Sequence, residues 1–222
     1  MTTASPAALR VVVLVSGRGS NLKAIAARAD AGLLPIRLEA VVSDRADAGA
    51  LTWASERGIA TAVLPPNGFP DRDAYGRALG DLVANFDPGL VVLAGFMRIL
   101  SDGFVNRFAG RLLNIHPSLL PRYPGLHTHR RVLEAGDREH GASVHFVTPE
   151  LDGGPVVIQA TVPVLPGDDE DSLAARVLVQ EHVIYPRCVE WFATGRLALR
   201  DGVPWLDGVP LDAPVVLDGA HG

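Results

Sequence analysis

The stretch LRVVVLVSGRGSNL, Leu9 to Leu22, runs from an unbroken apolar segment into a turn rich in glycine. A continuous run of Val and Leu is typical of a strand that is buried on both faces of a sheet. The segment that follows, NLKAIAARADAG (21–32), has helical spacing and ends at a glycine. The stretch therefore predicts a strand, a tight turn and a helix, which together form the first unit of an α/β fold.

The same strand–helix unit repeats along the first half of the chain. Helical patterns separate four further apolar segments, RLEAVVSD (37–44), ATAVLP (60–65), LVVLAGF (90–96) and RLLNIH (111–116). This order predicts a doubly wound, mostly parallel α/β sheet of the Rossmann-like kind, with helices on both faces.

The pattern changes in the second half. Two longer strand patterns, ASVHFVT (142–148) and PVVIQATVPV (155–164), are joined by PELDGG, so we expect antiparallel pairing in this C-terminal portion. Residues 169–195 predict a long amphipathic helix whose acidic start suits the helix dipole. We expect a single domain over 1–222, with 1–8 as a disordered leader and 196–222 as a short tail containing the apolar pieces LALR and VPWLDG.

Composition narrows the class of protein. The formal charge is −5 and is spread without blocks, whereas a nucleic-acid binder would normally carry a basic stripe. The single cysteine, Cys188, excludes an intrachain disulfide and a CxxC motif. The first apolar run is too short for a signal-peptide core or a membrane span. We therefore expect a soluble, cytoplasmic protein, a monomer or a homodimer, that binds neither nucleic acid nor a membrane.

The glycine turn SGRGSN (16–21) is a candidate anion site. In such folds the first strand–helix turn directs backbone N–H groups at an anion. The turn is not a dinucleotide fingerprint, because Leu22 stands where the third glycine belongs, and no Gly-Lys-Ser/Thr sequence follows. Gly19, Ser20 and Asn21 could hold a phosphate monoester through backbone and side-chain donors. Alternatively, Ser20 and Asn21 could serve only as helix caps.

The strand pattern RLLNIH ends in a second candidate site. Asn114 and His116 are two residues apart and therefore point to the same face of a strand. They lie at the carboxyl end of a predicted strand, where open α/β sheets bind ligands. An amide and an imidazole can both donate hydrogen bonds to a developing oxyanion, and a histidine can move a proton near neutral pH. The alternative is a structural histidine held by an asparagine.

Two nearby features favour chemistry at this strand end. The prolines of SLLPRYPG (118–125) stiffen the loop that follows it. Asp152 lies in a glycine turn, and a carboxylate close to His116 would favour the protonated imidazole and so supply a general acid. Asp152 could equally be a simple hairpin-turn residue.

The remaining histidines do not predict a metal site. The spacing of His127, His129, His140 and His145 matches no standard zinc pattern, and no cysteine supports one. We expect His127 and His129 to cap or brace a helix that starts near Thr128.

Four long segments resemble one known family, the phosphoribosylglycinamide formyltransferases, which are the folate-dependent transformylases of purine synthesis. These segments are VLVSGRGSNLKAI, VVLAGFMRILS, LLNIHPSLLPRYPGLHTHRRVLEAGDREHGASVHFV and ELDGGPVVIQATVPVLPGD. The resemblance implies the formyltransferase fold. It also implies transfer of a formyl group from 10-formyltetrahydrofolate, a cosubstrate rather than a tightly bound cofactor, to the amine of 5-phosphoribosylglycinamide.

The resemblance also implies roles for individual residues. Asn114 and His116 would stabilise the oxyanion, with His116 as general acid and Asp152 as its partner. Gly19, Ser20 and Asn21 would hold the ribonucleotide phosphate and the nearby ribose, and Glu181 the ribose hydroxyls. The folate pocket would be formed by Arg72, Met97, Arg98, Ile99, Leu100, Asn114, Val147, Thr148, Pro149, Glu150, Leu151 and Asp152. Arg18 stands where the family often has Asn or Ser, and we assign it no role.

Related enzymes and a non-catalytic module are the alternatives. A methionyl-tRNA formyltransferase would be expected to carry a further C-terminal domain, a more basic surface and RGAAP in place of PGLHTH (124–129). A formyltetrahydrofolate deformylase would carry a regulatory domain before the first strand. A non-catalytic nucleotide- or folate-binding module would be marked by loss of one of the three chemical residues, and all three are present.

Overall fold

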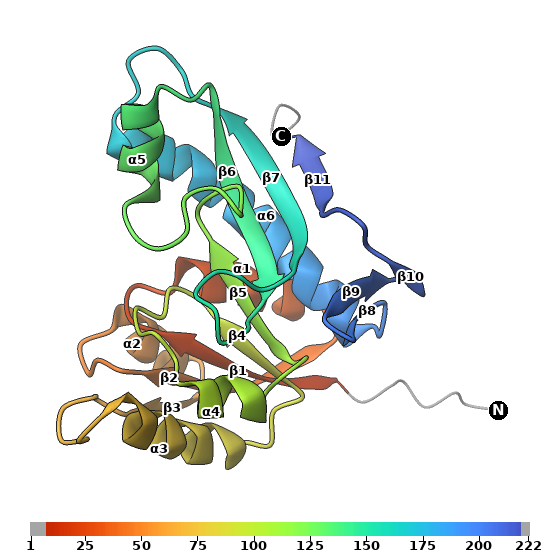
Figure 1. Cartoon of the computed structure of the whole chain (residues 1–222). Helices are drawn as coiled ribbons and strands as arrows, with labels where there is room; N and C mark the ends of the chain where they lie inside the picture. The colour runs from red at the N-terminus through yellow and green to blue at the C-terminus, as the bar shows by residue number, and fades with distance from the viewer. Residues whose placement is uncertain (1–7, 219–222) are drawn as a thin grey trace.

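The computed structural model describes residues 8–218, which form a twisted eight-stranded sheet with helices on both sides and a smaller three-stranded sheet (Figure 1). Residues 1–7 of the predicted leader and 219–222 of the predicted tail lie outside the described residues. Within the described part, no helix is long and apolar enough to cross a membrane.

The main sheet has the strand order β11-β7-β6-β5-β4-β1-β2-β3. The first five strands are parallel, which confirms the predicted doubly wound half. The β5–β6 and β6–β7 pairs are antiparallel, as expected for the C-terminal portion, whereas β11 runs parallel to β7. The bounds are β1 Leu9–Val15, β2 Ile36–Ser43, β3 Ala60–Val63, β4 Leu90–Leu93, β5 Leu112–His116, β6 Glu139–Phe146, β7 Val156–Pro163 and β11 Val215–Asp218.

Helices cover both faces because β1 is apolar and buried at every position from Val11 to Val15. Val11, Val13 and Val15 belong to one core, which includes α1 and α6, and Val12 and Leu14 belong to a second core, which includes α3 and α4. Two buried layers explain why this strand shows no alternation of polar and apolar residues. The helices are α1 Ser20–Asp30, α2 Gly49–Glu56, α3 Arg72–Ala84, α4 Asp102–Arg107, α5 Thr128–Ala135 and α6 Glu170–Ala193.

The carboxyl ends of β1, β4 and β5 lie side by side. Leu14 of β1 pairs with Leu93 of β4, and Leu93 pairs with Asn114 of β5. Neighbouring strands are about 4.8 Å apart, so the ends of β1 and β5 are roughly 10 Å apart. The chain order reverses between β1 and β4, and this switch point is where doubly wound sheets bind ligands.

Helix α6 packs against the central strands of the sheet. It begins with a capping box, in which Asp169 accepts from the N–H of Ser172 and the Ser172 hydroxyl accepts from the N–H of Asp169. The fully buried hydroxyl of Tyr185 lies 2.8 Å from the carbonyl oxygen of Leu93 and 3.0 Å from that of Leu113. The tyrosine thus fixes α6 against β4 and β5.

The predicted tail contains more regular structure than its glycines and prolines suggested. LALR and VPWLDG form most of a three-stranded antiparallel sheet, and β11 extends the main sheet at the edge strand β7. The small sheet consists of β8 Leu197–Arg200, β9 Val203–Leu206 and β10 Val209–Pro210.

Candidate active site

The glycine turn after β1 leaves the start of α1 open. Gly19 is the N-cap residue at φ 71°, and neither Ser20 nor Asn21 caps the helix with its side chain. A Cβ on Gly19 would lie only 2.7 Å from the Cβ of Ala50, so a larger residue would both clash and strain the backbone. Because Gly19 is the N-cap and no side chain caps the helix, the alternative that Ser20 and Asn21 serve as helix caps is wrong. The first N–H groups of α1 remain available to an anion.

Asn21 connects this turn to α6. Its Nδ2 donates to Glu181 Oε2 over 2.6 Å, and both side chains are buried. Burial raises the pKa of Glu181, while the hydrogen bond from Asn21 opposes that shift. The buried Oδ1 of Asn21 has no hydrogen-bond partner within residues 8–218. Glu181 lies one helical turn before Tyr185, on the face of α6 that the tyrosine fixes against the sheet.

At the end of β5, Asn114 contacts a histidine that sequence reasoning did not assign to the site. The Asn114 Nδ2 donates to His145 Nε2 over 3.1 Å, and His145 Nδ1–H donates to the carbonyl of Phe146 over 2.9 Å. Burial lowers the pKa of His145, so this ring stays neutral and orients the amide. His145 lies directly opposite Asn114 in the β5–β6 register.

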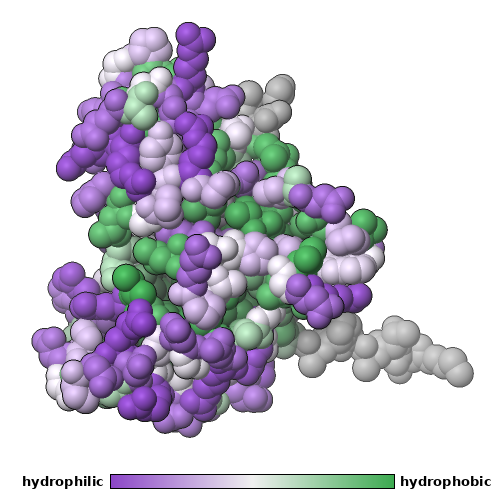
Figure 2. Space-filling view, viewed as in Figure 1, coloured by the Kyte–Doolittle hydropathy of each residue, from purple (hydrophilic) through white to green (hydrophobic). Residues whose placement is uncertain are grey.

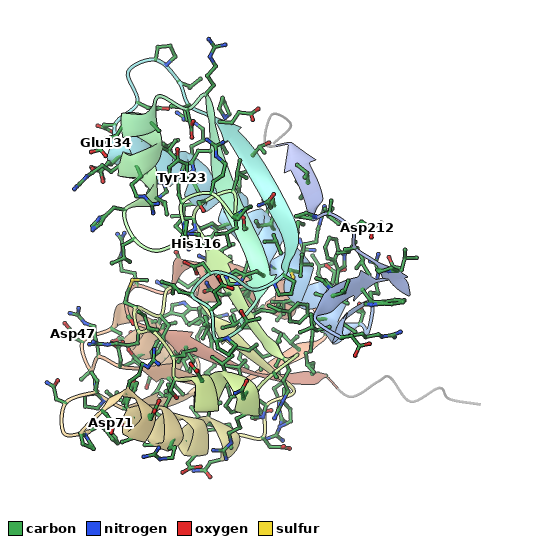
Figure 3. The ribbon with its side chains drawn as sticks, viewed as in Figure 1. Asp47, Asp71, His116, Tyr123, Glu134 and Asp212 are labelled. Carbon is green, nitrogen blue, oxygen red and sulfur yellow. The ribbon has the colours of Figure 1, made fainter. Side chains whose placement is uncertain are left out.

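His116 is engaged at both ring nitrogens. Its Nδ1 lies 3.4 Å from Asp152 Oδ2, and its Nε2 lies 2.9 Å from the carbonyl oxygen of Tyr123. Asp152 Oδ2 also accepts from the N–H of Gly125 over 2.8 Å. The side chains of His116 and Asp152 are only 7% and 8% exposed, so water screens a charge on either group only weakly. In Figure 3, His116 lies where the lower strands meet the loop that carries Tyr123.

A cleft opens beside these residues, with an empty volume of about 510 Å³ that includes its mouth. Figure 2 shows hydrophobic residues gathered in the middle of this face, between two hydrophilic regions. Met97, Ile99 and Leu151 are all more than half exposed. Ten of the predicted folate residues line the cleft, namely Arg98, Ile99, Leu100, Asn114, Val147, Thr148, Pro149, Glu150, Leu151 and Asp152.

Two predicted folate residues, Met97 and Arg72, are not among the residues that line this cleft. The N–H of Met97 donates to Ser16 Oγ over 2.8 Å, which ties the loop after β4 to the end of β1. Arg72 begins α3, where its guanidinium lies 3.9 Å from Asp102.

The remaining histidines and Arg18 lie outside the proposed catalytic group. His129 Nδ1 lies 3.0 Å from His140 Nε2, so His129 braces α5 against β6, but His127 makes no side-chain cap. Across residues 8–218, no group of three or more His, Cys, Asp or Glu side chains could hold a metal ion. Arg18 is exposed, and its side chain makes no hydrogen bond or ion pair within that range.

A turn with an uncapped helix start, an amide–imidazole–carboxylate group and a cleft with exposed apolar side chains lie near the carboxyl ends of neighbouring strands. A model of the Formyl transferase family matches residues 9–189 and places the chain among the formyl transferases. A phosphoribosylglycinamide formyltransferase from Escherichia coli (strain K12) is 56% identical over 200 residues, 90% of this chain and 94% of that protein. One from Haemophilus influenzae is 45% identical over 91% of this chain and 95% of that protein.

Solved structures agree with the sequence comparison. The structure of a phosphoribosylglycinamide formyltransferase from Coxiella burnetii matches with a TM-score of 0.90 and 46% identity, covering 94% of this chain and 99% of that one. The chain belongs to the phosphoribosylglycinamide formyltransferases.

Proposed function

We propose that this protein transfers the formyl group of 10-formyltetrahydrofolate to the amine of 5-phosphoribosylglycinamide in purine biosynthesis. The products are formyl-phosphoribosylglycinamide and tetrahydrofolate. The observation that carries the proposal is the position of the Asn114, His116 and Asp152 side chains. Asn114 and Asp152 line a cleft suited to an apolar ring system, and β5 is separated by β4 alone from β1, whose turn is suited to a phosphate.

The ribonucleotide binds across α1 and α6 in this proposal. Its phosphate accepts hydrogen bonds from the N–H groups of Gly19, Ser20 and Asn21, whose helix start is free of side-chain caps. Glu181 accepts from the ribose hydroxyls, and the unpartnered Oδ1 of Asn21 offers a further acceptor. These contacts direct the glycinamide amine toward the end of β5.

The reaction is nucleophilic addition followed by elimination. The amine attacks the formyl carbon, and the formyl oxygen becomes an oxyanion that accepts hydrogen bonds from Asn114 and protonated His116. Asp152 stabilises the imidazolium and relays protons through water. The intermediate collapses when the bond from carbon to N10 breaks, and N10 leaves with a proton.

The folate is a cosubstrate and not a resident cofactor. Its pterin-containing end enters the cleft formed by the loop after β4 and the loop between β6 and β7. Met97 and Arg72 contact the folate outside the cleft proper, with the Arg72 guanidinium near its acidic end. We further propose that residues 1–222 act as a single domain on small-molecule substrates, because every part of the proposed site is built around one eight-stranded sheet.

A coupled assay tests the proposal and separates a transferase from a hydrolase. The purified protein is given 10-formyltetrahydrofolate with and without 5-phosphoribosylglycinamide, and tetrahydrofolate and formylated ribonucleotide are both measured. We expect equal amounts of the two products and no tetrahydrofolate without the ribonucleotide. Release of formate without the ribonucleotide would indicate a deformylase, and folate binding without any turnover would indicate a binding module.

A further inference from the structure

One short loop segment holds both members of the His116–Asp152 pair. The carbonyl of Tyr123 lies 2.9 Å from His116 Nε2, and the N–H of Gly125 donates to Asp152 Oδ2 over 2.8 Å. A backbone carbonyl can only accept a hydrogen bond, so His116 Nε2 must carry a proton. The other nitrogen, Nδ1, faces the carboxylate of Asp152, which lines the cleft.

Tyr123 adopts a conformation that needs support. Its φ is 56°, in the left-handed region that bulky residues avoid, and it precedes a proline, which restricts its backbone further. Such conformations persist only where the surroundings hold them, and they gather at functional sites.

The side chain of Tyr123 supplies that support. Its hydroxyl donates to Asp137 Oδ2 over 2.6 Å, and Arg122 pairs with the same carboxylate. The guanidinium carbons of Arg122 and Arg131 lie 5.4 and 5.2 Å from the centre of the tyrosine ring. The Arg131 guanidinium also donates to the carbonyl of Pro124 over 2.6 Å. The ring is thus anchored by a carboxylate and two arginines, one of them from α5.

The start of the same loop is anchored to the sheet. The buried Ser143 hydroxyl donates to the carbonyl of Ser118 over 2.6 Å and accepts from the N–H of Leu120. Gln159 of β7 donates to the carbonyl of Leu120 over 2.8 Å. Both ends of the loop are therefore fixed, and the Tyr123 carbonyl has a defined position.

Three other imidazoles surround His116. Burial lowers the pKa of His129 and His145, and lowers that of His140 to about 4, so all three are neutral at pH 7. Besides Asp152, the charged side chains that act on these neighbours are Asp137 and Arg122 at His140 and Glu170 at His129. No neighbouring imidazolium therefore competes with His116 as the acid of the site near neutral pH.

We infer that Tyr123 is a positioning residue that fixes the tautomer of His116. Its carbonyl keeps one proton on Nε2, so that Nδ1, which faces Asp152, is the nitrogen that gains and loses the catalytic proton. This inference rests on the proposed function for its kinetic consequence. The tautomer itself can be measured without any turnover.

The direct test is ¹⁵N NMR of the histidine-labelled full chain, in which Nδ1 and Nε2 of a neutral ring give distinct shifts. The His116→Gln variant assigns the signals. In the wild-type protein we expect neutral His116 to carry its proton on Nε2. A neutral His116 with its proton on Nδ1 would overturn the inference, even in a fully active enzyme. A correct tautomer in a protein without formyl transfer would instead overturn the proposed function alone.

Variants of the anchor provide the second test. Tyr123→Gly accepts the left-handed backbone but removes the ring, and we expect mixed His116 tautomers and a kcat about tenfold to a hundredfold lower. The KM for the ribonucleotide should stay within about twofold. Asp137→Asn should give a smaller effect in the same direction and serves if Tyr123→Gly does not fold. The matched control is Asp207→Asn, which loses a similar pairing, with Arg196, in the C-terminal region. An unchanged tautomer and kcat in both anchor variants would show that Tyr123 is only structural.

Discussion

At the scale of single residues, the alternation of β5 decides which side chains can act together. Asn114 and His116 share one face, while Leu113 and Ile115 belong to the core on the other. The strand therefore carries the two polar side chains of the site on one face and remains apolar on the face that packs against the core. Asp152 then reaches His116 from a different loop, which makes the pair dependent on the fold and not on local sequence.

Substitution of the pair tests whether these residues act as one unit. His116→Ala removes the proposed acid and one oxyanion donor, so kcat should fall by about 10²–10⁴ while the Kd of each substrate changes little. Asp152→Asn leaves the imidazole without its anionic partner and should lower kcat in a similar range. The double variant should be little worse than the worse single variant, because the two residues serve the same step. Single-turnover kinetics measures all three.

The control for this series is His127→Ala, which alters an exposed histidine with no side-chain cap and should leave kcat unchanged. Multiplicative effects in the double variant would argue against a shared role. Near-normal turnover in Asp152→Asn would mean that Asp152 is only a turn residue, which was the alternative interpretation of its glycine-rich surroundings.

At the scale of elements, the sequence predicted the secondary structure of each segment better than the tertiary contacts between segments. The parallel strands, the glycine turn and the start of α5 near Thr128 were predicted because local periodicity and turn chemistry decide them. The partnership of Asn114 with His145 was not, because it depends on the register of two strands 31 positions apart in the chain. The strands of the tail were missed because glycine and proline also occur in short hairpins.

The free energy of unfolding should depend on pH through a buried histidine between α5 and β6. His140 of β6 is almost completely buried against His129 of α5, and burial lowers its pKa from an ordinary 6.5 to about 4. Between these values the unfolded chain binds a proton that the folded chain excludes. The free energy of unfolding is therefore at its full value above pH 6.5 and falls as the pH drops toward 4. A shift of this size corresponds to roughly 3 kcal/mol.

Urea unfolding at several pH values measures this slope. His140→Gln should be less stable than the wild-type protein at pH 7.5, because it changes a packed side chain. It should lose less stability between pH 6.5 and 4, because the titrating group is gone. His127→Gln is the control, and this exposed substitution should keep the wild-type slope. Parallel curves for wild-type and His140→Gln proteins would contradict the assignment.

At the scale of the whole molecule, the proposed substrate sites are assembled from segments that are far apart in the chain. Asn21 and Glu181 are 160 positions apart, yet they share a 2.6 Å hydrogen bond between α1 and α6. Sequence patterns placed each of them on a helix but could not place the two helices together. That placement follows from Tyr185, which fixes α6 by hydrogen bonds to the carbonyls of Leu93, at the end of β4, and Leu113, near the start of β5.

A ligand that bridges α1 and α6 should stabilise the folded chain as a whole. 5-Phosphoribosylglycinamide alone, at about 100 times its Kd, should add roughly 2.7 kcal/mol to the free energy of unfolding and raise Tm by about 5–10 °C. Glu181→Gln removes the carboxylate that we propose to accept hydrogen bonds from the ribose hydroxyls, and it should reduce this shift at the same ligand concentration. Inorganic phosphate, which would occupy only the turn at Gly19, should give a smaller shift that is equal in wild-type and Glu181→Gln proteins. Asp212→Asn, an exposed change, should keep both shifts. Differential scanning fluorimetry measures them, and an undiminished ribonucleotide shift in Glu181→Gln would remove Glu181 from the proposed site.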